Sequence, residues 1–188
     1  ALEALHKAKD EGKILHLGIT SHSSSVLMKI VKENIFETIM IPYNYLATVP
    51  SEDLLPLCRK MNVGTVIMKP LGGGAFSKIR TALKFLLDDL NVDVIIPGMM
   101  TFQEIEENFS VANSETLKLS SDELETIEKD KTELGNEYCR ACDYCQPCPQ
   151  EIPVSFILRT ETQVLKRMGW PQWAEAEFQK AKEKLPNC

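Results

Sequence analysis

The hydrophobic positions of the first 113 residues alternate between two patterns. Four short, nearly continuous apolar runs predict buried strands at residues 13–20, 36–46, 64–71 and 92–99. After each run, apolar residues recur every three or four positions, which predicts amphipathic helices at 23–34, 51–62, 78–91 and 101–113. A further amphipathic helix opens the chain within residues 1–13. This part of the chain therefore consists of repeated strand–helix units.

The alternation of strands with helices over short connections predicts right-handed βαβ units and hence a parallel sheet of the α/β class. Runs of Val, Ile, Leu and Met without polar alternation are typical of strands that are covered on both faces. Two architectures fit this pattern, an open doubly wound sheet and part of a (β/α)8 barrel. No G-x-G-x-x-G turn follows the first predicted strand, so the dinucleotide-binding form of the open sheet lacks its signature.

Polar residues at the starts of the helical patterns predict N-caps. Ser51 and Thr101 each precede a helical pattern at a position where a side-chain oxygen can accept from a free backbone N–H. Beyond the strand–helix units, residues 119–134 are typical of a charged surface helix, in which Ser120 and Glu123 form a capping box.

Residues suited to ligand binding gather where the predicted strands end. The segments GITSHS, PYNYL, KPLGGG and PGMMT all lie at the carboxyl ends of strands, where barrel enzymes build their active face. In PLGGGAF, residues 70–76, the glycines allow the backbone to approach a ligand closely, and backbone N–H groups there could hold a phosphate. A Gly triplet also occurs in plain flexible loops, so the motif alone leaves both interpretations open.

The order of these segments resembles the second half of an aldo/keto reductase. GKILHLGITSHS, IPYNYL, VIMKPLGGG and VIIPGMMTFQEIEENF follow one another as the last four barrel strands and their helices do in that family. The resemblance covers about residues 1–134 and implies that this first domain is the C-terminal half of a (β/α)8 TIM barrel. It further implies that the loops after the strands clasp a nicotinamide dinucleotide, NAD(P), and that the substrate is a small-molecule carbonyl compound.

The resemblance also implies a set of cofactor-binding residues. Its members correspond to family positions that hold the nicotinamide carboxamide, the pyrophosphate, the ribose phosphate and the adenine. The implied set is Thr20, Ser21, His22, Asn44, Lys69, Pro70, Leu71, Gly72, Pro97, Gly98, Met99, Glu107 and Asn108.

Three positions depart from the pattern of the family. Met40 and Met68 replace the Gln and Tyr that usually contact the nicotinamide, and Glu104 replaces an Arg that usually pairs with the 2′-phosphate of NADP. A carboxylate would repel that phosphate, which favours NAD or a flavin over NADP, although Glu104 also fits a solvated helix position. The catalytic Tyr, Lys, Asp and His of the family belong to the first four strands, so no catalytic residue is assigned to this chain.

The composition is that of a globular protein and argues against two classes of partner. The 188 residues carry a formal net charge of −6, which argues against a nucleic-acid partner, and no apolar run is long enough to cross a membrane.

Because the sequence opens inside a helix without an initiator Met, we expect it to be a piece of a longer protein. Half a barrel would leave two strand edges unpaired, so we expect it to need the missing half or a second copy.

Four of the six cysteines fall within CRACDYCQPCP, residues 139–149. Two residues separate each of Cys139, Cys142, Cys145 and Cys148 from the next, and a proline follows the last. Such spacers let successive thiolates wrap one compact iron–sulfur core, although the ferredoxin run has three residues before its fourth cysteine. Zinc is the rival metal, but structural zinc usually has a longer spacer between two cysteine pairs. Disulfides are less typical of so tight a loop.

The phrase CRACDYCQPCPQEIPV resembles the appended motif of the ferredoxin-type subgroup of aldo/keto reductases. It implies a 4Fe-4S cluster in a second domain, residues 135–188, and an electron-transfer protein as a partner. Within this domain, residues 154–185 predict two helices broken near Trp170 and Trp173, whose rings we expect to pack the extension together. Cys188 matches the start of a second cluster motif in the subgroup, and is otherwise a lone thiol.

The resulting hypothesis is an oxidoreductase fragment from a reducing, cytoplasmic compartment, with a nicotinamide or flavin cofactor and an iron–sulfur cluster. Two alternatives stay open. One is an interaction module in which a cluster or zinc only staples the C-terminal helices. The other is a barrel reductase whose cluster is vestigial. The sequence also leaves a homo-oligomer open.

Overall fold

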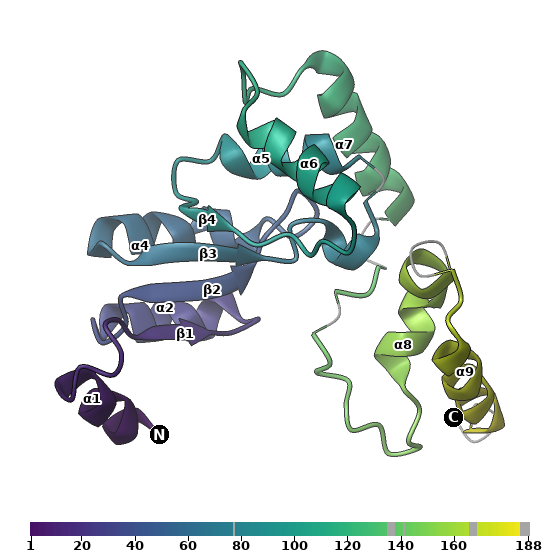
Figure 1. Ribbon diagram of the computed structural model, residues 1–188, viewed down its shortest axis with the longest axis horizontal. Helices are drawn as coiled ribbons and strands as arrows, with labels where there is room; N and C mark the ends of the chain where they lie inside the picture. Colours follow the sequence, from purple (N-terminus) through teal and green to yellow (C-terminus); the bar gives the residue numbers. More distant parts are fainter. Residues whose placement is uncertain (77, 135–137, 141, 166–168, 185–188) are drawn as a thin grey trace.

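A four-stranded sheet forms the centre of the protein (Figure 1). The computed structural model describes residues 1–188 except 77, 135–137, 141, 166–168 and 185–188. The strands lie side by side in chain order, as β1 (Gly18–Thr20), β2 (Thr38–Pro42), β3 (Gly64–Met68) and β4 (Val94–Ile95). All three pairings are parallel. The predicted parallel α/β sheet is therefore confirmed.

Helices precede β1, occupy the connections between the strands, and form most of the chain after β4. They are α1 (Leu2–Asp10), α2 (Ser24–Lys32), α3 (Val49–Glu52), α4 (Leu54–Met61), α5 (Ile79–Leu87), α6 (Phe102–Ala112), α7 (Ser121–Leu134), α8 (Val154–Arg159) and α9 (Gln172–Lys184). A 3₁₀ turn, η1 (Gly72–Gly74), follows β3, and a π-helical turn, η2 (Thr160–Leu165), follows α8. The predicted elements are present and most are shorter than predicted, while the predicted helix 51–62 is divided into α3, which begins at Val49, and α4.

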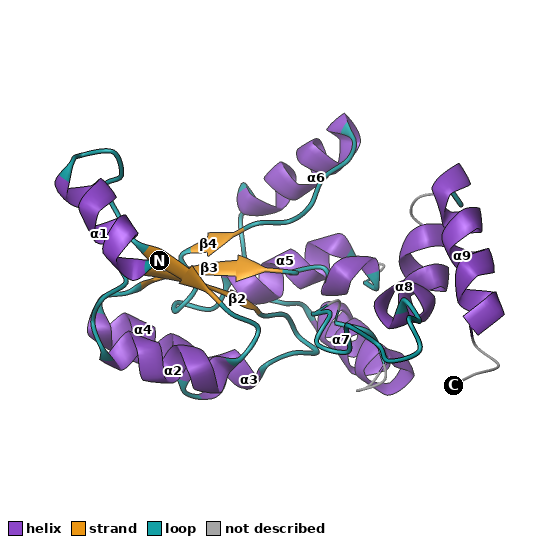
Figure 2. Ribbon diagram, turned by 90° about the horizontal axis from the view of Figure 1, so that it is seen from below, coloured by secondary structure: helices purple, strands orange, loops and turns teal. Residues whose placement is uncertain are grey.

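The first hydrophobic core lies between the sheet and the helices α2 and α4, which run side by side along one face (Figure 2). Ile39, Ile41 and Ile67 are at most 1% exposed, and they belong to the same core cluster as Leu27 of α2 and Leu55 of α4. The alternate residues of β2 and β3, on the opposite face, are only half-buried. The apolar runs predict strands that are covered by helices on both faces. In the described part of the chain, the helices bury one face of the sheet, and the other face is only half-buried.

The second core joins α5, α6 and α7 to the chain segments that leave β2 and β3. Its buried members are Tyr45, Leu71, Phe76, Ala82, Leu83, Val111 and Ile127. The rings of Tyr45 and Phe76 stack with their centroids 4.0 Å apart, and the Tyr45 hydroxyl donates to Asp130 at 2.5 Å. This core therefore packs the helices that follow β3 and β4, up to α7, against the loops at the ends of β2 and β3.

A buried ion pair links α5 to the start of α7. Lys84 Nζ lies 2.6 Å from Glu123 Oε2, and the two side chains are 6% and 17% exposed. The same carboxylate accepts from the Ser120 backbone N–H at 2.8 Å, and Ser120 Oγ accepts from the Glu123 N–H at 3.3 Å, which confirms the predicted capping box. Burial raises the pKa of Glu123, but the hydrogen bonds from Lys84 and Ser120 outweigh it and lower this pKa overall.

The other predicted caps have different outcomes. Thr101 accepts from the backbone N–H of Glu104 at 3.2 Å, and Glu104 returns a contact to the cap, so α6 begins with a complete capping box. The prediction for Ser51 is wrong. α3 begins two residues earlier, at Val49, and the Ser51 hydroxyl donates to the Thr48 carbonyl at 2.7 Å.

The C-terminal extension is packed by aromatic rings, as predicted. Trp170 meets Phe178 of α9 edge-on at 5.6 Å between centroids, and Trp173 meets Phe156 of α8 at 6.0 Å. Figure 1 places this extension beyond the arrowheads of the strands, on the side of their carboxyl ends.

One flank of the described structure is apolar and open to solvent. It comprises the last strand and the helix that follows it, where Val94 is 48%, Phe102 is 86% and Phe109 is 69% exposed. None of the helices in the described part of the chain is long and apolar enough to cross a membrane.

Candidate functional site

The carboxyl ends of the strands form one edge of the sheet, toward which the arrowheads in Figure 1 point. Thr20 ends β1, Asn44 follows β2 by two residues, Lys69 follows β3 directly, and Pro97 follows β4 by two residues. Because the strands are parallel and adjacent in chain order, the residues implied for the cofactor lie along this edge in the same order.

The implied residues fall into three groups by exposure. Exposed are Thr20, Gly98, Met99 and Glu107. Half-buried are Ser21, His22, Lys69, Pro97 and Asn108. Buried are Asn44, Pro70, Leu71 and Gly72. The buried group contributes to packing: Gly72 has φ +58°, and a Cβ there would lie 2.7 Å from the ring of Phe76. Glycine is therefore required at this turn by the protein's own core.

Asn44 organises the edge from within. Its Nδ2 donates to the Lys69 carbonyl at 3.0 Å, and its Oδ1 accepts from the backbone N–H groups of Leu46 and Ala47, each at 3.0 Å. The side chain is 2% exposed, so these bonds satisfy a polar group that would be costly to bury alone. Asn44 thus ties the loop after β2 to the turn after β3.

The segment that carries the four cysteines, residues 138–148, docks against this edge. Lys69 Nζ donates to the Arg140 carbonyl at 3.0 Å. The Tyr138 hydroxyl lies 3.5 Å from Asn44 Oδ1, and the ring of Tyr144 meets His22 edge-on at 5.7 Å. The cysteine segment therefore contacts the chain after β1, β2 and β3, at residues implied for the cofactor.

The electrostatics of the edge reflect this contact. Burial lowers the pKa of the Lys69 ammonium, although the nearby Cys142, Asp143 and Cys139 act in the opposite direction. Burial and the charge of Lys69 lower the pKa of His22, which favours the neutral imidazole. Lys69 also has φ +55°, a strained conformation for a residue with a side chain.

Two side-chain atoms of the described residues are buried without a hydrogen-bond partner, His22 Nε2 and Asn108 Oδ1. Both belong to the set that the family resemblance implies for the cofactor. Buried polar atoms are nearly always paired, so an unpaired one indicates a position where a ligand or water completes the bonding. These two atoms fit a polar ligand that runs along the edge.

None of the four cysteines of the segment is joined in a disulfide bond within the described residues. Cys139, Cys142 and Cys148 are half-buried and Cys145 is exposed, while Cys139 Sγ lies 3.9 Å from the hydroxyl of Ser155. Within the described ranges, no three Cys, His, Asp or Glu side chains converge on a point that could hold a metal ion. The donor types and their spacing fit a cluster, whereas the thiols in this structure are not gathered around one. The implied second motif at Cys188 lies outside the described residues.

Sequence reasoning missed the residues that fasten the segment to the sheet. Tyr138 directly precedes the first cysteine, and Arg140 and Tyr144 stand between cysteines. Their signal was the mixture of aromatic and basic residues in and next to the cysteine-rich motif. Cys58, in contrast, lies in the first core with 0% exposure, and burial raises the pKa of its thiol to about 11.

Comparisons with known proteins agree with this geometry. Residues 1–81 match the family model for the Aldo/keto reductase family. Among solved structures, an aldo-keto reductase from Bacillus halodurans in its holo form is similar with a TM-score of 0.55 and 22% identity, over 68% of this chain and 54% of that chain. Its apo form is similar with a TM-score of 0.54 and 22% identity, over 68% and 55% of the two chains.

The likeness to these structures shows the fold: the parallel sheet and its helices are consistent with part of a TIM barrel of the kind that aldo/keto reductases have. The chain spans about half the length of the structures that it matches. The matched segment, residues 1–81, includes β1, β2 and β3 with their carboxyl ends, and so the part of the edge that the cysteine segment contacts.

Proposed function

We propose that this chain belongs to an aldo/keto reductase-like oxidoreductase that binds a nicotinamide dinucleotide along the carboxyl edge of the sheet and an iron–sulfur cluster in the cysteine segment. The observation that carries the first half is the match of residues 1–81 together with the parallel strand order, which brings the implied residues to one edge. A small-molecule carbonyl compound is the proposed substrate, and a reducing, cytoplasmic compartment fits cysteines that form no disulfide bond in the described part of the chain.

The two unpartnered buried atoms support dinucleotide binding. His22 Nε2 follows β1 in the region implied for the nicotinamide, and Asn108 Oδ1 lies on α6 in the region implied for the adenine. A ligand that is extended along the edge would supply a partner to each. The bound nicotinamide would supply a hydride, and the residues of this chain would hold and orient it.

Lys69 has a divided role in this proposal. The family resemblance places it beside the pyrophosphate, and in the structure its ammonium donates to the Arg140 carbonyl. A pyrophosphate at this position would share the ammonium with the cysteine segment. Dinucleotide binding and docking of the segment are therefore coupled through one side chain.

Glu104 favours NADH over NADPH in this proposal. Its carboxylate accepts from the backbone N–H groups of Met100 at 2.5 Å and Thr101 at 3.3 Å, so it is held at the start of α6. A fixed carboxylate near the ribose would repel a 2′-phosphate by about 1 kcal/mol even in water-like surroundings, or roughly fivefold in affinity. A flavin is the alternative occupant.

Titration with NADH and NADPH, followed by nucleotide fluorescence, tests the first half of the proposal. We expect NADH to bind more tightly, and we expect Asn108→Ala to weaken binding because it removes the implied adenine contact. Asn113→Ala, at the end of the same helix, is the matched control because its amide donates to the Phe109 carbonyl. Absence of saturable binding by both nucleotides, or equal effects of the two variants, would contradict dinucleotide binding at this edge.

The second half of the proposal concerns the four thiols. Cys139, Cys142, Cys145 and Cys148 would hold a 4Fe-4S cluster, which would accept or donate single electrons. Metal binding commonly gathers ligands that are apart beforehand, so four thiols on one short segment fit a site that assembles around its metal. Zinc retained by the same thiols would instead support a purely structural metal site that holds the C-terminal helices together.

A further inference from the structure

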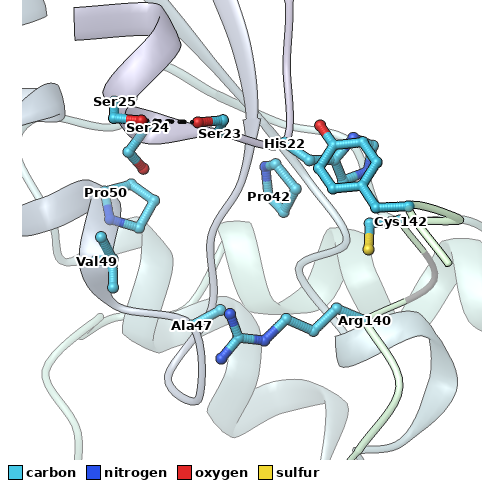
Figure 3. Close-up of a pocket in the computed structure, with 11 residues that line it drawn as sticks. His22, Ser23, Ser24, Ser25, Pro42, Ala47, Val49, Pro50, Arg140 and Cys142 are labelled. Atoms are coloured by element: carbon cyan, nitrogen blue, oxygen red, sulfur yellow. Dashed lines mark hydrogen bonds between the residues drawn. The ribbon is translucent and has the colours of Figure 1, made fainter.

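A separate cavity lies beside the edge, between the start of α2, the loop after β2 and the cysteine segment (Figure 3). Its volume is about 380 Å³, within the range of small-ligand sites. Its walls come from three parts of the chain that are far apart in sequence: residues 22–25, four residues between 42 and 50, and the three residues 140, 142 and 144. The cavity exists only where the cysteine segment meets the sheet.

The polar groups of the cavity are concentrated around one positive charge. Arg140 lines the wall from the cysteine segment, and its guanidinium extends toward Ala47 in Figure 3. His22 lines the adjacent wall, with Nε2 buried and without a partner among the described residues. Ser23 and Ser24, at the start of the nine-residue helix α2, face the same space, where the helix dipole favours negative charge.

The remaining walls are apolar. Pro42, Ala47, Val49 and Pro50 form most of them, and the ring of Tyr144 adds an aromatic surface next to His22. Ser25 and the proposed cluster ligand Cys142 complete the lining. The lining contains no lysine and no second arginine, so a ligand with two negative charges would keep one charge uncompensated beside apolar side chains. The cavity therefore suits a single negative charge attached to a compact apolar body.

We propose that this cavity binds a small monocarboxylate, with its carboxylate on the Arg140 guanidinium, a hydrogen bond to His22 Nε2, and its apolar part against Pro42 and Val49. Guanidinium groups recognise carboxylates through a planar pair of donors, which matches one arginine and a monoanion. The site shares His22 with the proposed dinucleotide position, but it needs neither a dinucleotide nor a metal. It goes beyond the proposed oxidoreductase function because it adds an anion-binding subsite.

Calorimetric titration of the purified chain with sodium benzoate, without nucleotide, tests this inference. We expect saturable binding that is roughly tenfold or more weaker in Arg140→Gln, because a charged hydrogen-bonding partner is lost. Arg80→Gln is the matched control, since Arg80 is an exposed arginine that contacts Ser114 away from the cavity. Benzamide, which has the same ring without the charge, should bind weakly or not at all.

Two further measurements keep the location and the ligand class falsifiable. Ala47→Leu should reduce benzoate binding by filling the cavity while leaving the Asn44 bonds to the backbone intact. Inorganic phosphate should compete poorly. Lack of saturable benzoate binding by the unmodified chain, equal affinity in Arg140→Gln and Arg80→Gln, unchanged affinity in Ala47→Leu, or tighter binding of phosphate than of benzoate would each overturn the proposal.

Discussion

The contact between Lys69 and the cysteine segment gives the most informative single substitution. Lys69→Met removes the ammonium that donates to the Arg140 carbonyl at 3.0 Å while keeping a long unbranched side chain. The substitution leaves the strain of φ +55° at this position essentially as it was, because Met and Lys share the same backbone restrictions. The substitution therefore tests the hydrogen bond by which Lys69 holds the cysteine segment.

The magnitude follows from the bond that is lost. A hydrogen bond from a charged donor contributes about 1.5–3 kcal/mol, and Lys69 is half-buried, which places the value near the lower end. A loss of about 1.5 kcal/mol raises the population of the undocked segment roughly tenfold. Backbone amides near Arg140 should then exchange with solvent roughly ten times faster, because exchange reports local opening.

Hydrogen–deuterium exchange measured by mass spectrometry on peptides that carry Arg140 is the assay. Lys60→Met is the matched control, since Lys60 is exposed on α4. Faster exchange in Lys69→Met alone is the predicted result. Unchanged exchange in Lys69→Met, or equal acceleration in Lys60→Met, would refute the reasoning that Lys69 fastens the cysteine segment to the sheet.

Three other predictions concern stability and association. Glu123→Gln should lower the free energy of unfolding by about 3 kcal/mol, because it leaves the buried Lys84 charge without its partner. Glu128→Gln, at an exposed ion pair, should lower it by less than about 1 kcal/mol. Equal losses in chemical denaturation would contradict this prediction. Because the pKa of Glu123 is lowered in the folded state, the ionised carboxylate should stabilise the folded protein fully above the ordinary carboxyl pKa. This contribution should be lost as the pH falls through the lowered pKa, so the denaturation midpoint of the unmodified protein should fall more steeply with acid than that of Glu123→Gln. The exposed apolar flank of β4 and α6 should make the chain self-associate. Phe109→Ser should therefore reduce the apparent mass in sedimentation more than Val26→Ser does at another exposed apolar position. Equal effects of the two variants would contradict association through this flank.

Local patterns in the sequence predicted the elements of this fold because each pattern acts over a few residues. The apolar runs and the helical spacing gave the parallel order, and Thr101 with Glu104 gave a cap that depends only on its own turn. The cap predicted at Ser51 is wrong because α3 starts at Val49, two residues before it. A serine that can cap a helix does not by itself show at which residue the helix begins.

The site was less predictable because its contacts join distant parts of the chain. The cysteine spacing indicated a metal site, but it could not show that Arg140 and Tyr144 meet residues of the sheet more than 70 positions earlier. The same holds for Asn44, which the resemblance implies as a cofactor residue and which the structure shows bonded to the neighbouring loop and turn. Such pairings depend on how β strands bring separate loops together, which no local pattern encodes.

The central claim is that the cysteine segment holds an iron–sulfur cluster at the edge of a reductase-type sheet. Its most direct test is the content of iron and acid-labile sulfide in protein purified without oxygen. We predict roughly four of each per chain, lost in Cys142→Ser and retained in Cys58→Ala. Material that holds zinc, or that holds no iron and no sulfide, would contradict the claim.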